Sequence, residues 1–238
     1  MALPRSTATR AVISRSALAD AAAAAVAAGG SIADLRRDAY GHGLLPIAHA
    51  VLRAGAQVVR VDGAEQVRML RAEGLAATDA DEPDIDVDLL YGLPEGAGSG
   101  SRPVMRLTGT VMSLKPLHRG EAVSYGYTHR AAADTTLALV TGGYAQAIVR
   151  ALGNRAHVEM HGRLHAIVGR IAMDVCVIDL GNADRLTGAP VAEGDEVTYF
   201  GGSGPAREAL REWSAATGLT AAELVCAAGL RASRAEED

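Results

Sequence analysis

The chain has 238 residues and a formal net charge of −5, with acidic and basic side chains interspersed. This distribution excludes the electropositive surface of a protein that binds nucleic acid or an anionic membrane, and favours small-molecule or protein partners. The apolar run over residues 21–28 is too short to span a bilayer, and no secretory signal is apparent, so we expect a cytoplasmic protein. Cys176 and Cys226 lack metal-binding spacing, which predicts reduced thiols that pack in the core.

The basic residues are almost all arginines. Among the 23 lysines and arginines, Lys115 is the only lysine. Chemistry that needs a primary amine therefore has two candidates, the Lys115 side chain and the amino terminus.

The first hundred residues alternate between strand and helix patterns. Apolar runs and helical periodicity, with Gly at the helix ends, predict strands over 11–14, 31–37 and 56–62 and helices over 16–28, 42–55 and 63–74. Such alternation is typical of βαβ units with a parallel sheet. The acidic residues 76–88, including Asp84, Asp86 and Asp88, read as a solvated loop, and a Gly/Ser-rich boundary follows at 93–103.

The second half of the chain has short β patterns separated by turn residues. The predicted strands lie within 104–114, 121–127, 136–144, 156–160, 165–180 and 195–202. This pattern favours an antiparallel barrel or sandwich. Two short helices, over 206–216 and 220–228, are expected to close the chain, the second with a capping box of Thr220 and Glu223. We therefore expect two domains, 1–100 and 101–238, with residues 10–15 able to pair with the second.

Several motifs, in this order, resemble those of the alanine racemase family of fold-type III pyridoxal-phosphate (PLP) enzymes. RRDAYGHG at 36–43 is similar to the family motif K-x-[DN]-A-Y-G-H-G, and LLYGLPEG at 89–96 to the last barrel strand and its exit. SYG at 124–126 and IAMDVCVIDL at 171–180 resemble motifs of the C-terminal β domain. The resemblance implies a PLP-binding (β/α)8 barrel of the TIM type followed by an antiparallel β domain. It also implies a homodimer that interconverts L- and D-alanine.

The resemblance gives five residues a place in the site. Arg36 occupies the position of the lysine that holds PLP, and Tyr40 that of a tyrosine that contacts the cofactor phosphate. Tyr125 corresponds to the catalytic base, which the partner subunit supplies, and Met173 and Tyr144 to residues that contact substrate. The three tyrosines also have a structural interpretation, as packing or interface residues, and Met173 has one as a packed strand residue. Arg36 could pair with a phosphate or a carboxylate.

Two departures from the family pattern predict impaired or absent catalysis. A guanidinium stays protonated, so Arg36 cannot form the Schiff base that holds the aldehyde. A barrel of this type takes about 250 residues, whereas this chain reaches its linker near residue 100. We therefore expect a truncated barrel of a few βα units. Lys115 corresponds to a position in the β domain and is not expected to substitute for the missing lysine.

Three functional interpretations remain open. The chain is a degenerate homologue that serves as a dimerisation or interaction module, pairing with itself or with a full-length racemase. Alternatively, it is an active PLP enzyme of altered chemistry that takes an amino acid, or a product under little selection. In the last case, unpaired sheet edges would make residues 1–100 poorly soluble or dependent on association.

Histidines mark two further positions. His157, His161 and His165 recur at four-residue spacing, but a hairpin turn at Gly162 is expected to keep their rings apart, so no metal site is predicted. His42, within the RRDAYGHG motif, is expected to cap or orient the turn.

Overall fold

The computed structural model describes residues 8–96, 102–181 and 190–238. The amino terminus, the centre of the predicted Gly/Ser-rich boundary and residues 182–189 lie outside these ranges. Contacts divide the chain into two compact units. The barrel unit comprises Met1–Arg10, Leu107–Leu219 and Arg231–Ser233, and the sheet unit comprises Ala11–Arg106, Thr220–Leu230 and Arg234–Asp238.

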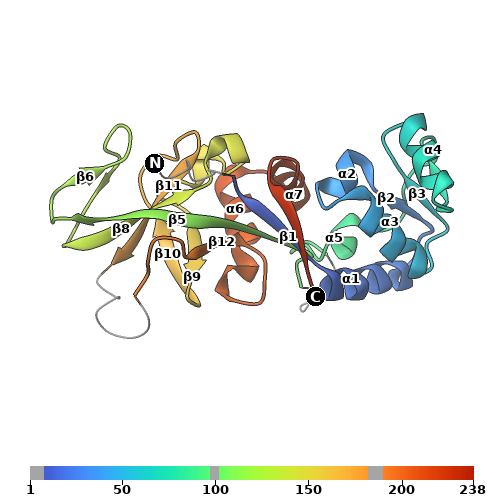
Figure 1. Ribbon diagram of the computed structural model, residues 1–238, viewed down its shortest axis with the longest axis horizontal. Coiled ribbons are helices and arrows are strands. Elements are labelled where there is room, and N and C mark those ends of the chain that lie inside the picture. Colours follow the sequence, from blue (N-terminus) through green and yellow to red (C-terminus); the bar gives the residue numbers. More distant parts are fainter. Residues whose placement is uncertain (1–7, 97–101, 182–189) are drawn as a thin grey trace, which may run out of the picture. The chain divides into compact units, whose positions relative to one another are not determined.

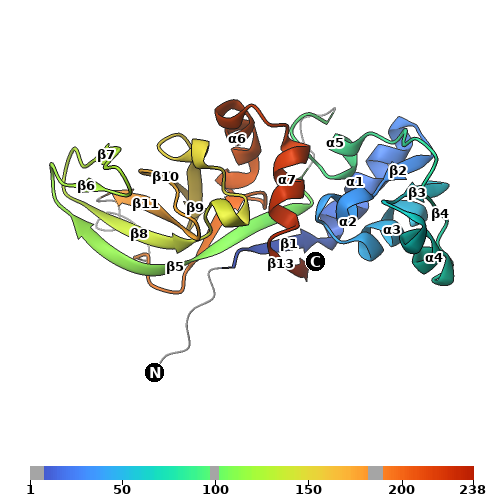
Figure 2. The same cartoon turned by 90° about the horizontal axis from the view of Figure 1, so that it is seen from above.

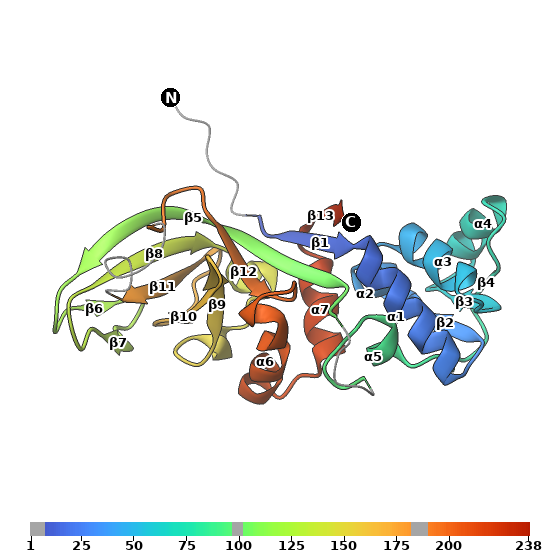
Figure 3. The ribbon, with the colours of Figure 1, turned by 90° about the horizontal axis from the view of Figure 1, so that it is seen from below.

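The barrel unit is built around a closed antiparallel ring of strands (Figure 1). Its members are β5 (Met105–Leu117), β8 (Thr135–Thr141), β9 (His157–Met160), β10 (Arg163–Ile167), β11 (Val175–Gly181) and β12 (Glu196–Phe200). The hydrogen-bonded order is β12-β9-β10-β11-β8-β5, and β12 also pairs with β5, which closes the ring. β5 is the longest strand and curves along the barrel (Figure 3). The sequence pattern of the second half of the chain allowed an antiparallel barrel or a sandwich, and the structure shows the antiparallel barrel.

Alternation along the strands fills the barrel interior. In β11, Cys176, Ile178 and Leu180 are buried while their neighbours are partly exposed, the period of two expected of a strand with one face in the core. Trp213 closes part of the core from α6 (Ala209–Thr217), with its ring edge-on to Phe200 at 5.4 Å between ring centroids. The hairpin of β6 (Ala122–Val123) and β7 (His129–Arg130), seen in Figure 2, projects from the same unit.

The sheet unit contains three short parallel strands. They are β2 (Ile32–Asp34), β3 (Val58–Arg60) and β4 (Ala77–Thr78), in the order β2-β3-β4. The helices between and beside them are α1 (Arg15–Ala28), α3 (Leu44–Arg53) and α4 (Ala64–Ala72). The predicted parallel βαβ arrangement is confirmed, with Asp34 opposite Arg60 in the register of β2 and β3.

Four further short elements are β1 (Arg10–Ser14), α5 (Val87–Leu90), α7 (Ala221–Gly229) and β13 (Ser233–Glu237). β1 and α7 were expected, and the capping box of Thr220 and Glu223 at the start of α7 is confirmed. The sequence pattern missed β4, α5 and β13. Strand β4 lies within the predicted loop of residues 76–88, α5 spans the end of that loop and the start of the LLYGLPEG motif, and β13 follows the helix that was expected to close the chain.

Asp84 and Asp86 are exposed and lie outside helices and strands, as the prediction of a solvated loop requires, yet both carboxylates also bind backbone groups. The Asp84 carboxylate accepts hydrogen bonds from the backbone N–H groups of Ser31 and Ile32, at 2.7 and 2.6 Å, where β2 begins. Asp86 caps α5 by accepting from the N–H groups of Asp88 and Leu89. Both carboxylates satisfy backbone donors that would otherwise lack partners. Asp84 thereby holds the segment against β2, and Asp86 stabilises the first turn of α5.

None of the helices in the described part of the chain combines the length and the apolar character that a membrane-spanning helix requires.

Candidate functional site

Strand β2 leads into one turn of left-handed helix. Residues Arg37, Asp38, Ala39 and Tyr40 have φ values of 54°, 56°, 54° and 53°. The strand predicted over 31–37 therefore ends earlier, at Asp34. Each L-residue in this conformation costs roughly 1–2 kcal/mol. The surrounding contacts must offset that cost, which makes the turn a place where the fold maintains an unfavourable backbone.

Two aspartates hold the outer side of the turn. Asp38 accepts a hydrogen bond from the backbone N–H of Leu44 at 2.7 Å, where α3 begins, and forms an ion pair with Arg234. Asp62, beyond the end of β3, accepts from the backbone N–H of Arg37 at 2.8 Å. The turn is thus tied to segments from three different parts of the sheet unit.

His42 holds the inner side of the turn, as predicted. Its buried ring stacks on the Tyr91 ring at 4.3 Å between centroids. Its Nδ1 lies 3.0 Å from the Ala39 carbonyl and 3.1 Å from the Tyr40 carbonyl, so this nitrogen carries the proton. Burial lowers the pKa of His42 to about 4, and the imidazole is neutral at physiological pH.

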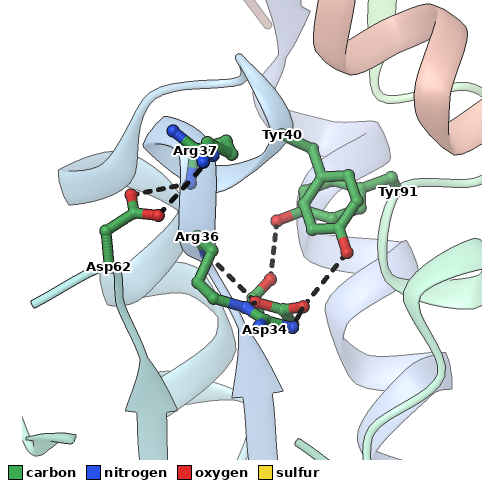
Figure 4. Close-up of polar contacts among 6 residues, drawn as sticks. All are labelled: Asp34, Arg36, Arg37, Tyr40, Asp62 and Tyr91. Carbon is green, nitrogen blue, oxygen red and sulfur yellow. Dashed lines mark hydrogen bonds and ion pairs between the residues drawn. The ribbon is translucent and has the colours of Figure 1, made fainter. Parts of the chain in front are cut away.

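The centre of the candidate site is the Asp34 carboxylate (Figure 4). Arg36 Nε and Nη2 donate to its two oxygens, at 2.9 and 2.7 Å, in a bidentate ion pair. The backbone N–H of Arg36 donates to Oδ1 at 3.1 Å, and the Tyr40 hydroxyl donates to Oδ2 at 3.0 Å. The Tyr91 hydroxyl donates to the Asp34 backbone carbonyl at 3.1 Å. Asp34 is 3% exposed, so this buried carboxylate is fully engaged with its neighbours.

The electrostatics of this cluster match its geometry. Burial alone would raise the pKa of Asp34, but the hydrogen bonds from Arg36 and Tyr40 lower it below its ordinary value. The hydrogen bonds to Asp34 raise the pKa of Arg36 further above its already high value. Burial and the Asp34 charge raise the pKa of Tyr40 to about 12. At neutral pH the cluster therefore holds one carboxylate, one guanidinium and a neutral phenol.

Met173 and Tyr144 are brought together on the barrel unit. The backbone N–H of Tyr144 donates to the Ala172 carbonyl at 3.0 Å, and that of Ala145 to the Met173 carbonyl at 2.9 Å. Gly143 is required here, because a Cβ at this position would lie 2.4 Å from the Met173 carbonyl oxygen. Met173 is 54% exposed and lies outside the strands, so its interpretation as a packed strand residue was wrong.

Tyr125 also belongs to the barrel unit and is 80% exposed, which excludes a core role within this chain. The loop beneath it is fixed to a neighbouring segment, since Ser124 Oγ donates to the Arg170 carbonyl and accepts from the Arg170 N–H, at 2.8 and 2.7 Å. The Arg170 guanidinium lies 6.0 Å from the centroid of the Tyr125 ring, within the range of a cation–π contact. The ring is thus presented outward from a fixed backbone.

Lys115 and the histidine repeat both belong to the barrel unit. Lys115 is exposed on β5, in the barrel unit, whereas Arg36 belongs to the sheet unit. The predicted turn at Gly162 is confirmed between β9 and β10. His157 Nδ1 lies 2.7 Å from Glu212 Oε1, and His161 Nε2 lies 3.1 Å from Asp195 Oδ2. In the residues that the structure describes, no three His, Cys, Asp or Glu side chains are grouped to hold a metal ion.

Sequence reasoning missed Asp34 and Tyr91. The available signal was an aspartate inside the apolar run IADL, two positions before Arg36, because alternate strand residues share a face. Burial of an aspartate calls for a partner, and the nearest cation on that face is Arg36.

Comparisons with known proteins agree across sequence and structure. Residues 104–236 match the family profile described as alanine racemase, C-terminal domain. The alanine racemase of Mycolicibacterium vanbaalenii is 40% identical over 141 residues, which cover 56% of this chain and 35% of that protein. That of Salinispora arenicola is 34% identical over 196 residues, which cover 79% of this chain and 50% of that protein. The chain therefore spans about a third to a half of the length of these relatives.

Solved structures show the same fold at low sequence identity. Alanine racemase from Streptomyces lavendulae superimposes with a TM-score of 0.78 at 21% identity, with 98% of each chain covered. The enzyme from Bartonella henselae, described with covalently bound pyridoxal phosphate, superimposes with a TM-score of 0.74 at 17% identity, covering 97% of this chain and 99% of that one.

Proposed function

The chain belongs to the alanine racemase family, and from this premise we propose that it is a member without racemase catalysis. The family uses PLP to interconvert L- and D-alanine. The observation that carries the proposal is the bidentate ion pair of Arg36 and Asp34, at the position of the cofactor lysine. An arginine there offers no amine that can become neutral, and this one is further stabilised in its charged form.

The residues present do not fit the cofactor. Tyr40, in the position of the phosphate-contacting tyrosine, donates its hydroxyl to Asp34. A phosphate bound at that hydroxyl would lie close to the ionised Asp34 carboxylate, because both groups would contact the same hydroxyl oxygen, and two like charges this close repel each other. The ion pair with Asp34 engages Nε and Nη2 of Arg36, so a phosphate bound by the remaining N–H groups would lie next to the same carboxylate. We therefore assign no step of the reaction to PLP in this chain.

The proposal extends to the domain arrangement. We propose that the three-stranded parallel sheet is the remnant of a PLP-binding barrel, that the domain boundary lies near residue 100, and that the protein is cytoplasmic. The short parallel strands with intervening helices support the first of these statements. Tyr125, Tyr144 and Met173 are then residues of a former substrate site whose chemistry is lost.

The first test is for activity and covalent attachment. The purified chain, incubated with PLP and L-alanine, is expected to form no D-alanine above the blank. Borohydride reduction followed by peptide mass spectrometry is expected to find no cofactor on any internal residue. A Lys115→Arg variant removes the only lysine side chain, and a full-length family racemase serves as the positive control. Conversion at an ordinary enzymatic rate, or an adduct that Lys115→Arg abolishes, contradicts the proposal.

A second candidate function is a module for association, with itself or with a racemase-like chain. Tyr125, Tyr127 and Met173 support it, because they expose 80%, 74% and 54% of their surface on one unit. Aromatic residues and methionine are enriched in protein interfaces, and large exposed apolar groups mark such surfaces.

This second function predicts a concentration-dependent assembly. Light scattering after size exclusion should show a dimer of the chain, or a mixed complex when a full-length family racemase is added. The double variant Tyr125→Ser/Met173→Ser should weaken either assembly at least tenfold, whereas the variant Leu164→Ser, at another exposed apolar residue, should leave it unchanged. A monomer that binds no racemase at any tested concentration excludes this function.

A further inference from the structure

Arg36 is one barrier to covalent attachment of an aldehyde, and the adjacent carboxylate forms another. We infer that Asp34 is an independent second barrier, which would hold any amine placed at position 36 as a paired ammonium ion. The inference deepens the proposed loss of PLP chemistry and rests on it. It states that restoring lysine at position 36 is insufficient while Asp34 remains.

The position of the carboxylate does not depend on the Arg36 side chain. Two of its four hydrogen bonds come from the Arg36 backbone N–H, at 3.1 Å, and the Tyr40 hydroxyl, at 3.0 Å. Both donors remain when residue 36 changes. Asp34 would therefore stay ordered and ionised in the variant Arg36→Lys.

A lysine at position 36 would reach this carboxylate. Its ammonium group lies one bond beyond the atom that corresponds to Arg36 Nε, and Nε is 2.9 Å from Asp34 Oδ1. An opposite charge at such a distance favours the charged form of the amine. The ammonium form has no lone pair, so it cannot add to a carbonyl carbon.

The other groups near the cluster do not cancel this effect. Glu82 and Tyr40 act on the residue 36 side chain in the same direction as Asp34. Tyr91 and Cys226 are neutral at physiological pH, because burial raises the pKa of each. Arg60, on the adjacent strand, lies opposite Asp34 in the register. As a cation it is the group that would oppose protonation of an amine at position 36. Arg37 and Arg234 are already paired with Asp62 and Asp38.

The test compares Arg36→Lys with Asp34→Asn/Arg36→Lys, both in a Lys115→Arg background, so that the introduced lysine is the only one in the chain. Asparagine keeps the shape of Asp34 and removes its charge. With 15N-labelled lysine, NMR titration reports the protonation of the introduced side chain directly. In parallel, each protein is incubated with PLP as the probe, reduced with borohydride over a pH series and analysed by peptide mass spectrometry.

The single variant is expected to keep its lysine protonated to a pH about 1 unit or more above that of the double variant. Labelling of residue 36 by PLP at neutral pH should accordingly be about tenfold slower in the single variant. Equal titration midpoints, or equal labelling, would overturn the inference. If the double variant does not fold, as judged by circular dichroism, Asp34→Ser/Arg36→Lys makes the same comparison.

The wild-type chain is measured in the same series, and this separates the two proposals. Racemisation or an internal adduct in the wild type would contradict the proposed function whatever the variants show. An inert wild type with equal midpoints in the variants would contradict only the role of Asp34.

Discussion

Replacing Gly41 by alanine is expected to lower the free energy of unfolding of the sheet unit by about 3 kcal/mol or more. Gly41 follows the left-handed turn and has a φ of 78°, a conformation that disfavours a Cβ. A Cβ here would also lie 2.7 Å from the Gly229 Cα and 2.8 Å from its carbonyl carbon, at the end of α7. Both neighbours are backbone atoms, so the clash cannot be relieved by a side-chain rotation.

Two matched variants separate the cost of a side chain at positive φ from the cost of the clash with α7. Gly74 has the same φ of 78°, and a Cβ added there would have nothing within 4 Å, so Gly74→Ala should cost only about 1 kcal/mol. Gly229→Ala tests the contact without a positive φ, because its Cβ would meet the Gly41 carbonyl oxygen at 2.6 Å. Urea unfolding followed by circular dichroism gives the free energies, and hydrogen exchange of α7 peptides locates the loss. Equal losses for Gly41→Ala and Gly74→Ala would show that the contact with α7 contributes nothing.

The sequence predicted those parts of the fold that rest on periodicity and local capping. The alternation of strands and helices in the sheet unit, the period of two along β11 and the capping box at Thr220 each depend on residues that are close in the chain. Strand β4 has two residues and α5 has four, so neither is long enough to show a period.

The candidate site was predictable in its chemistry and not in its geometry. The identity of residue 36 alone excludes an amine, whatever the fold. The left-handed turn at 37–40 was not predictable, because non-glycine residues adopt this conformation only where distant contacts hold them. Those contacts come from Asp62, Arg234 and Tyr91, which lie up to 196 residues away from the turn in sequence.

The geometry and the chemistry of the site rest on different contacts, which explains how the family fold would persist without the family chemistry that we propose is lost. The turn is maintained by Asp38, Asp62 and His42, through bonds that do not involve the Arg36 guanidinium. The Asp34 carboxylate, in contrast, satisfies Arg36 and Tyr40 and leaves no charge unpaired within this cluster. The turn and residue 36, which corresponds to the cofactor lysine in the family motif, are therefore supported by different side chains. The proposed loss of catalysis at position 36 does not require loss of the turn.

The stability of the sheet unit should fall by on the order of 3 kcal/mol as the pH is lowered from 6.5 to about 4, because of His42. Burial lowers the pKa of His42 from 6.5 to about 4, so between these values the unfolded chain binds a proton that the folded chain does not. Stability then rises with pH through this window. The contribution of the neutral ring is fully present above pH 6.5 and is lost as the pH falls toward 4. The pKa of Asp34 is lowered below 3.8, so the stability that Asp34 contributes begins to fall only at the acid end of this window, where the carboxyl of the unfolded chain takes up a proton.

Urea unfolding at a series of pH values, followed by circular dichroism, measures the slope of the free energy of unfolding against pH in the wild type and in His42→Phe. Phenylalanine keeps a ring against Tyr91 but cannot bind a proton. It also removes the hydrogen bond to the Ala39 carbonyl, so the variant should be less stable at pH 7 by about 1 kcal/mol and show a flatter pH profile. The control His118→Gln removes a histidine whose side chain is 70% exposed and should leave the wild-type slope intact. A slope that survives in His42→Phe would assign the acid sensitivity to another group and remove His42 as the neutral support of the turn.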